Sequence, residues 1–191
     1  MHDARGGGGE RAPVERCSLP GDAAALTCDT ATGKRLATVL VVDDAARPTA
    51  VVHVAPGAIN RREAVDMPEA DPASLFAACA GYVAYAARKG GIVWVPSRGN
   101  GWKLFEWEGR ITALGFVDDA GTLAVSMYSD ADDTTTLVRL DAAGNASVAA
   151  RIGAAQADPD SDGRVLAMAH DEARGVLWVA GGFGVAAFAI K

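Results

Sequence analysis

Short apolar runs separated by turn-forming residues dominate the sequence and limit the folds open to it. The runs are rich in β-branched residues and end at Gly, Pro or paired Asp residues. They lie at residues 36–42, 50–54, 92–95, 103–107, 111–117, 123–128, 135–140, 147–152, 165–169, 176–180 and 185–190. Runs of about four to eight residues with this punctuation are typical of β-strands in hairpin succession. The sequence therefore predicts a mainly β fold.

One alanine-rich segment departs from this pattern. Asp71 suits a helix N-cap, Pro72 suits the first helical position, and residues 73–87 are rich in alanine, the best helix former. Against a helix, Gly81 interrupts the segment, and the aromatic and β-branched residues around it favour strands. Two alternatives remain open here, one helix over residues 72–88 or two strands broken at Gly81.

An internal repeat links the middle of the chain to its end. Gly91 begins the sequence GIVWVP and Gly175 begins GVLWVA, so that Trp94 and Trp178 both occupy the fourth position. The two starts lie 84 residues apart, which is twice 42. Residues 110–121 and 164–175 also match, each with a strand, an acidic turn and a Gly that opens the next strand. A period of about 40–45 residues is typical of propeller blades, and it predicts Trp94 and Trp178 as equivalent core anchors.

Residues 91–191 resemble the tryptophan–aspartate and kelch-like β-propeller repeats, although the chain has no Trp-Asp dipeptide and no Gly-His start. The resemblance implies a small β-propeller of about four antiparallel blades, or a partial one. Residues 163–191 supply only three strands, so we expect a fourth strand from residues 13–19. If the ring does not close in one chain, its open sheet edges imply pairing with another chain or with a second copy, as a homodimer.

A second resemblance rests on the size, the Ala-, Gly- and Arg-rich composition and the ending GVLWVAGGFGVAAFAIK. In these features the chain is similar to short propeller proteins encoded beside a MoxR-type ATPase and a von Willebrand A protein in bacterial three-part conflict systems. This resemblance implies a protein partner, either the ATPase or the von Willebrand A protein.

Length and composition fit one folded domain. The chain has 191 residues, of which 50% are hydrophobic, so that wholesale disorder is excluded. We expect a flexible tail over residues 1–12, which are Gly-rich and charged, and a single propeller-like domain over residues 13–191. The net charge of −6 and the scattered arginines argue against nucleic acid or an anionic membrane as the main partner.

Cysteine usage and the start of the chain bear on its compartment. Cys17, Cys28 and Cys79 are odd in number and show no CxxC spacing, so we expect free thiols. No apolar run approaches the roughly 18–20 residues of a bilayer span, and the first residues lack the apolar core of a secretory signal. These features predict a cytoplasmic protein.

Motifs for metals and catalysis are weak. Asp158, Asp160 and Asp162 form the D-x-D-x-D-G start of a calcium loop, whose alternating carboxylates suit a hard cation. The ligand that would close such a loop is missing, because Leu166 and Ala169 occupy the two places where it is needed. We therefore expect a solvated turn, with calcium as the weaker alternative and no other cofactor. No nucleophile elbow and no phosphate-binding loop occurs, so we expect no enzymatic activity.

Aromatic residues near the middle of the chain suggest a contact surface. Trp102 and Trp107 lie in one predicted hairpin beside Arg98, and Trp and Arg are enriched in binding hot spots. Packing of an edge strand is the favoured role for these residues, and a contact with a partner is the alternative. The sequence thus favours a non-catalytic protein-binding scaffold of propeller type. The alternative is a propeller enzyme or a small-molecule- or sugar-binding protein with its site at the channel mouth.

Overall fold

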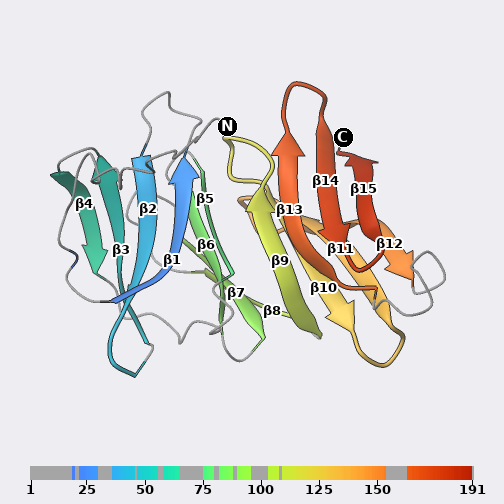
Figure 1. Cartoon of the computed structure of the whole chain (residues 1–191), viewed down its shortest axis with the longest axis horizontal. Helices are drawn as coiled ribbons and strands as arrows, with labels where there is room; N and C mark the ends of the chain where they lie inside the picture. Colours follow the sequence, from blue (N-terminus) through green and yellow to red (C-terminus); the bar gives the residue numbers. More distant parts are fainter. Residues whose placement is uncertain are drawn as a thin grey trace, which may run out of the picture.

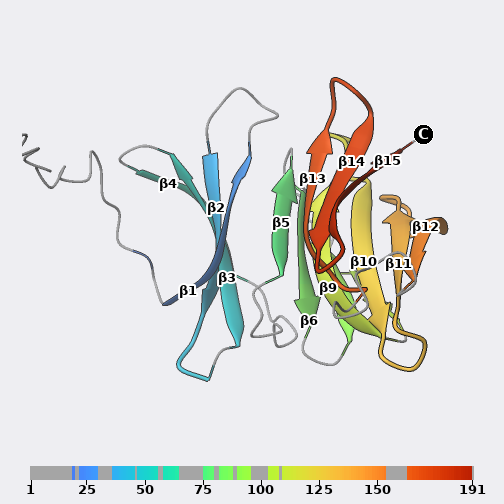
Figure 2. The same cartoon turned by 45° about the vertical axis from the view of Figure 1, so that its right-hand side comes forward.

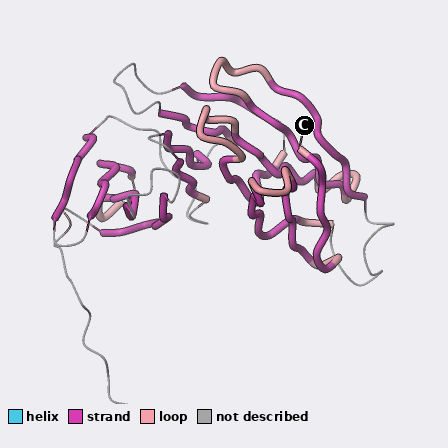
Figure 3. The backbone as a smooth tube through the Cα atoms, turned by 90° about the horizontal axis from the view of Figure 1, so that it is seen from above, coloured by secondary structure: helices cyan, strands magenta, loops and turns pink. Residues whose placement is uncertain are grey.

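The computed structural model describes residue 19 and residues 22–29, 36–45, 47–55, 58–64, 75–79, 82–87, 90–95, 103–107, 109–153 and 163–190. These residues form strands and turns, and no helix occurs among them (Figure 3). The described residues therefore contain no helix that could span a membrane. The predicted tail over residues 1–12 lies outside the described residues.

Among the described residues, fifteen strands form four antiparallel sheets, in each of which the strands follow one another in chain order (Figure 1). Sheet A contains β1 (Asp22–Asp29), β2 (Leu36–Val42), β3 (Pro48–Ala55) and β4 (Ala58–Ala64). Sheet B contains β5 (Phe76–Cys79), β6 (Tyr82–Ala87), β7 (Gly91–Val95) and β8 (Lys103–Glu106). Sheet C contains β9 (Arg110–Phe116), β10 (Leu123–Ser129), β11 (Thr134–Leu140) and β12 (Ala146–Gly153). Sheet D contains β13 (Val165–Asp171), β14 (Val176–Gly181) and β15 (Gly184–Ala189).

The sheets pack face to face in an arc, which is the arrangement of propeller blades. Their first strands contact one another in turn, with β1 on β5, β5 on β9 and β9 on β13 (Figures 1 and 2). Buried apolar clusters fill the spaces between sheets A and B, B and C, and C and D. Within the described residues, β13 and β1 do not pack on each other in this way, so the arc is open between sheets D and A. The predicted mainly β fold of about four blades is confirmed.

The predicted helix over residues 72–88 is wrong, and the alternative of two strands is confirmed by β5 and β6. Side chains of β6 alternate strictly between two neighbours. Val83 and Tyr85 pack toward sheet A, whereas Ala84 and Ala86 pack toward sheet C. Because a strand directs alternate side chains to opposite faces, β6 buries side chains against both neighbours. This tertiary packing overrides the helical preference of alanine. Asp71 and Pro72 lie outside the described residues.

The predicted repeat is partly wrong. Trp94 lies on β7, the third strand of sheet B, whereas Trp178 lies on β14, the second strand of sheet D, so the two residues are not equivalent. The match between residues 110–121 and 164–175 holds, because both stretches form the first strand of a sheet and the turn that follows. Gly121 and Gly175 each open the second strand with a positive φ, 88° and 61° respectively. The interval between these sheets is 54 residues, longer than the predicted period.

The N-terminal segment does not contribute to sheet D where the structure describes it. Leu19 is the one described residue of the predicted closing strand over residues 13–19, and it packs against the outer face of sheet A. The centre of that face consists of Val39, Val41, Ala50 and Val52, all of which are buried. The open end of the arc at sheet A is therefore partly covered, and the end at sheet D shows three strands among the described residues.

Candidate protein-interaction face

The sequence-predicted contact residues are only partly described. Arg98 and Trp102 lie outside the described residues. Trp107 follows β8, and its ring packs against the core between sheets B and C, beside Phe105. The indole N–H of Trp107 is buried and makes no hydrogen bond. This placement matches the packing role that was favoured for Trp107, while a role in partner binding stays a prediction.

The aspartates of the weak calcium motif, Asp158, Asp160 and Asp162, lie outside the described residues. In the part of the chain that the structure describes, no group of three or more His, Cys, Asp or Glu side chains could hold a metal ion. The Cys79 Sγ lies 3.5 Å from the Asp118 carbonyl oxygen and 3.4 Å from Asp119 Oδ1, so its single S–H can donate to either oxygen. These contacts join β5 of sheet B to the β9–β10 turn of sheet C.

Sheets C and D are built alike, residue by residue. In sheet C, Ser126 pairs with Ala113 on one side and with Leu137 on the other. In sheet D, Ala180 pairs in the same way with Ala167 and Val185. The next row repeats the correspondence, because Ala124 lies between Gly115 and Arg139, and Trp178 lies between Ala169 and Ala187. Residues of β9, β10 and β11 in sheet C thus have defined counterparts in β13, β14 and β15 of sheet D.

Counterpart positions differ sharply in exposure. The Ala113, Ala124 and Leu137 side chains face sheet D and are only 4%, 5% and 1% exposed. On sheet D, Trp178 is 40% exposed and Val185 is 70% exposed, because within the described residues no further sheet packs on them. The face of sheet D that the next blade of a propeller would cover is therefore uncovered.

The uncovered surface is mainly apolar and extends across three strands, with Asp171 at its turn end. We call it the open face of sheet D and define it by Leu166, Ala167, Ala169, Trp178, Val185 and Ala187. Its opposite face is buried against sheet C through residues that include Val165, Leu177 and Val179. A large exposed apolar patch on a folded protein marks an interaction site, and a partly exposed Trp is a frequent hot spot. The prediction that Trp178 is a core anchor is therefore wrong.

The sequence held a signal for this face that was missed. In VLWVAG and GVAAFA, the residues directed to either side of the strand are almost all apolar or glycine. Such two-sided apolar strands are typical of a sheet that is covered on both faces. Sheet D is therefore expected to be covered on both faces, and among the described residues only sheet C packs on it.

A polar cluster fixes the start of β13 on sheet C. The Tyr128 hydroxyl donates a hydrogen bond to Asp133 Oδ1, which also accepts from the Gly163 N–H at 3.4 Å. The buried Thr135 hydroxyl donates to the Gly163 carbonyl oxygen at 2.6 Å, and the Arg164 guanidinium lies 5.2 Å from the centre of the Tyr128 ring. The hydrogen bond to Asp133 raises the pKa of Tyr128. These contacts set the position of sheet D, and thereby of its open face.

Aspartates at strand ends hold the loops of the arc. Asp43 accepts from the backbone N–H of Arg47 at 2.9 Å, and its other oxygen lies 3.0 Å from the Arg47 guanidinium. Asp141 binds Asn145 in the same way, through the backbone N–H at 2.7 Å and the side-chain amide at 2.8 Å. These hydrogen bonds lower the pKa of both carboxyl groups. Asp118 likewise accepts from the backbone N–H four residues later, at 2.8 Å. The carboxylates are thus engaged in stabilising turns.

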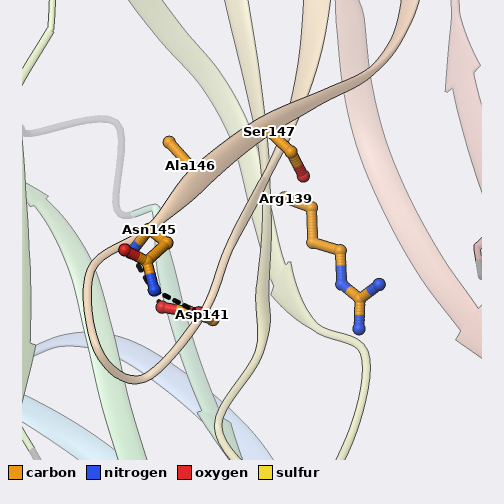
Figure 4. A pocket seen from close by; sticks show the side chains of 5 residues that line it. All are labelled: Arg139, Asp141, Asn145, Ala146 and Ser147. Atoms are coloured by element: carbon orange, nitrogen blue, oxygen red, sulfur yellow. Dashed lines mark hydrogen bonds between the residues drawn. The ribbon is translucent and has the colours of Figure 1, made fainter.

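A pocket of about 230 Å³ lies at the β11–β12 turn (Figure 4). Asp141 and Asn145 line it but bind each other, while Ala146, Ser147 and Arg139 form the rest of the lining. Ligand pockets usually enclose about 300–1,000 Å³ and present several converging polar groups. The pocket is small and lies at the outer part of sheet C, away from the first strands that line the inside of the arc.

The four-sheet arc matches solved β-propeller structures. A structure of BBS1N in complex with ARL6DN, soaked with lead, aligns with a TM-score of 0.58 and 10% identity over 94% of this chain and 55% of that chain. A structure of YCF48 bound to D1 peptide aligns with a TM-score of 0.56 and 13% identity over 93% and 53% of the two chains. At these identities the likeness shows the fold alone, and the chain spans about half the length of both structures. No family model and no curated protein matches the chain.

Proposed function

We propose that the chain is a non-catalytic, protein-binding scaffold of propeller type that binds through the open face of sheet D. One observation carries the proposal. Trp178 and Val185 are 40% and 70% exposed on a face whose counterpart on sheet C is buried by another sheet. When a protein docks on such a face, the apolar side chains are removed from water, and this burial stabilises the complex. The propeller structures that contain ARL6DN or D1 peptide support a role in protein binding.

The contacts of the polar groups support binding over catalysis. Asp43, Asp118 and Asp141 accept hydrogen bonds within their own turns, and Asp133 binds Tyr128 and Gly163. Among the described residues, no observation specifically favours the alternative of an enzyme or of a sugar-binding protein with its site at the channel mouth.

The partner class that we propose follows from the sequence resemblance. A MoxR-type ATPase or a von Willebrand A protein encoded beside this chain is an expected partner of the scaffold as a whole, within a bacterial three-part conflict system. We also propose a reducing, cytoplasmic setting, supported by the odd number of cysteines and by their lack of CxxC spacing. Genes for both proteins should flank the gene of this chain, and their absence would contradict this narrower assignment.

Site-specific photo-cross-linking in the source cells tests the proposed function. A photoreactive amino acid is placed at Trp178 in one variant and at Val148 in a control. Val148 is 57% exposed on β12, the outermost strand of sheet C, away from the open face. We expect protein adducts from position 178 and few from position 148, and mass spectrometry of the adducts identifies the partner. If position 178 yields no more adducts than position 148, the open face is not a binding surface and the proposal is wrong.

A further inference from the structure

We propose that a second copy of this chain docks on the open face of sheet D, so that two four-sheet arcs close into one ring. In this ring, sheet A of each copy packs on sheet D of the other. The inference rests on the proposed function, because it names the partner of the same face. It follows from where the exposed apolar side chains lie, from the way successive sheets contact one another and from the size of the related folds.

The large exposed apolar side chains are concentrated at the two ends of the arc. The described residues include six of them: Leu26, Leu104, Val148, Leu166, Trp178 and Val185. Leu26 lies on sheet A, and three others lie on sheet D. The remaining two lie on β8 and β12, which are the outermost strands of sheets B and C. Four of the six therefore lie on sheets A and D, each of which has a neighbouring sheet on one side only among the described residues.

The first strands of sheets A and D each carry one leucine, and the two leucines are exposed to a similar extent. Leu26 on β1 is 65% exposed, and Leu166 on β13 is 66% exposed. Leu26 pairs with Val39, which faces away from sheet B, so Leu26 lies on the outer face of sheet A. First strands make the contact between every pair of successive sheets in the arc. Packing of β13 on β1 of another copy repeats that contact once more.

The partly covered outer face of sheet A still permits this contact. Its buried centre lies on β2 and β3, where Leu19 packs against it, whereas Ala23 and Leu26 on β1 are exposed. The exposed part is thus the first strand, which is the strand that each successive sheet contacts.

Symmetry and size favour a second copy as the occupant. A twofold axis makes the sheet A–sheet D contact twice and leaves no end of either arc open, which is the usual closed form of a homodimer. The chain covers 55% and 53% of the two propeller chains that it matches, so two copies have about the length of one such chain. Ring closure also removes open sheet faces that otherwise promote uncontrolled association.

Sedimentation velocity of the purified 191-residue chain over a range of concentrations tests the inference. We expect a species of twice the 19.6 kDa chain mass that dissociates on dilution. Because the ring uses both ends of the arc, Leu26→Asp and Leu166→Asp should each raise the dimer dissociation constant by at least about tenfold. Leu104→Asp and Val148→Asp are matched controls on outermost strands and should leave it unchanged. Circular dichroism verifies that each variant keeps its fold.

The outcomes separate this inference from the proposed function. A chain that stays monomeric at every concentration overturns the inference. If Leu166→Asp weakens the dimer and Leu26→Asp does not, sheet D of one copy packs on sheet D of the other. This result also overturns the ring. If the chain is monomeric and position 178 still cross-links to a different protein in cells, the proposed function stands and only the second copy is excluded.

Discussion

Two counterpart residues, Leu137 on sheet C and Val185 on sheet D, allow a quantitative test of the uncovered face. Leu137 is 1% exposed in the core between sheets C and D, so Leu137→Ala removes buried volume and leaves a cavity. Buried Leu→Ala substitutions cost about 2–5 kcal/mol of unfolding free energy, and we expect about 3 kcal/mol here. Val→Ala removes two methylene equivalents, worth about 1.6 kcal/mol when fully buried. Val185 is 70% exposed, so Val185→Ala should cost about 0.5 kcal/mol in the monomer.

Urea unfolding followed by circular dichroism measures both values, at a protein concentration low enough for the chain to be monomeric. The expected result is a loss of unfolding free energy that is several times larger for Leu137→Ala than for Val185→Ala. Similar losses for the two variants would mean that the same chain covers sheet D, and they would refute the placement of Val185 on an open face.

Three further predictions concern turns and hydrogen bonds. Gly121→Ala should cost about 2 kcal/mol by urea unfolding, because φ is +88° there and a Cβ would lie 2.9 Å from the Tyr82 ring; a neutral effect would contradict the described turn. Thr135→Val should cost about 1–2 kcal/mol, because a buried carbonyl oxygen loses its donor; an unchanged Tm would show that water replaces the hydroxyl. The lowered pKa of Asp141 stabilises the fold above the ordinary value of 3.8, and this contribution is lost as pH falls through the lowered pKa. Asp141→Asn should therefore make Tm less sensitive to acid, whereas parallel profiles for both proteins would contradict the described turn.

Much of the fold could be predicted because strand signals in this chain are local. The run LATVLVV is β2 with the same bounds as predicted, since β-branched residues fill it and Asp43 ends it with a hydrogen-bonded turn. Strands β1 and β4 were missed. The sequence of β4, AINRREA, has three charged residues and no strict alternation, and β4 lies at the outer edge of sheet A. At such an edge, charged residues are tolerated because one side of the strand is unpaired.

The remaining features depend on contacts between segments far apart in the chain. Alanine-rich β6 is a strand because sheets A and C enclose it, which its local composition does not encode. Trp94 and Trp178 share a local pattern, yet they differ in their place within a sheet because strand order depends on the whole sheet. The open face of sheet D could be recognised only once the counterpart face of sheet C was seen to be buried.

Thiol reactivity at position 185 tests most directly whether sheet D is uncovered within one chain. In a background with Cys17→Ser, Cys28→Ser and Cys79→Ser, the variants Val185→Cys and Leu137→Cys are labelled with a thiol reagent under native conditions. At low protein concentration, we expect position 185 to react nearly as fast as the unfolded chain and position 137 to be strongly protected. Protection at position 185 should increase with protein concentration as a second copy docks. Equal protection of both positions at every concentration would mean that the chain covers its own sheet D, and the open arc would be wrong.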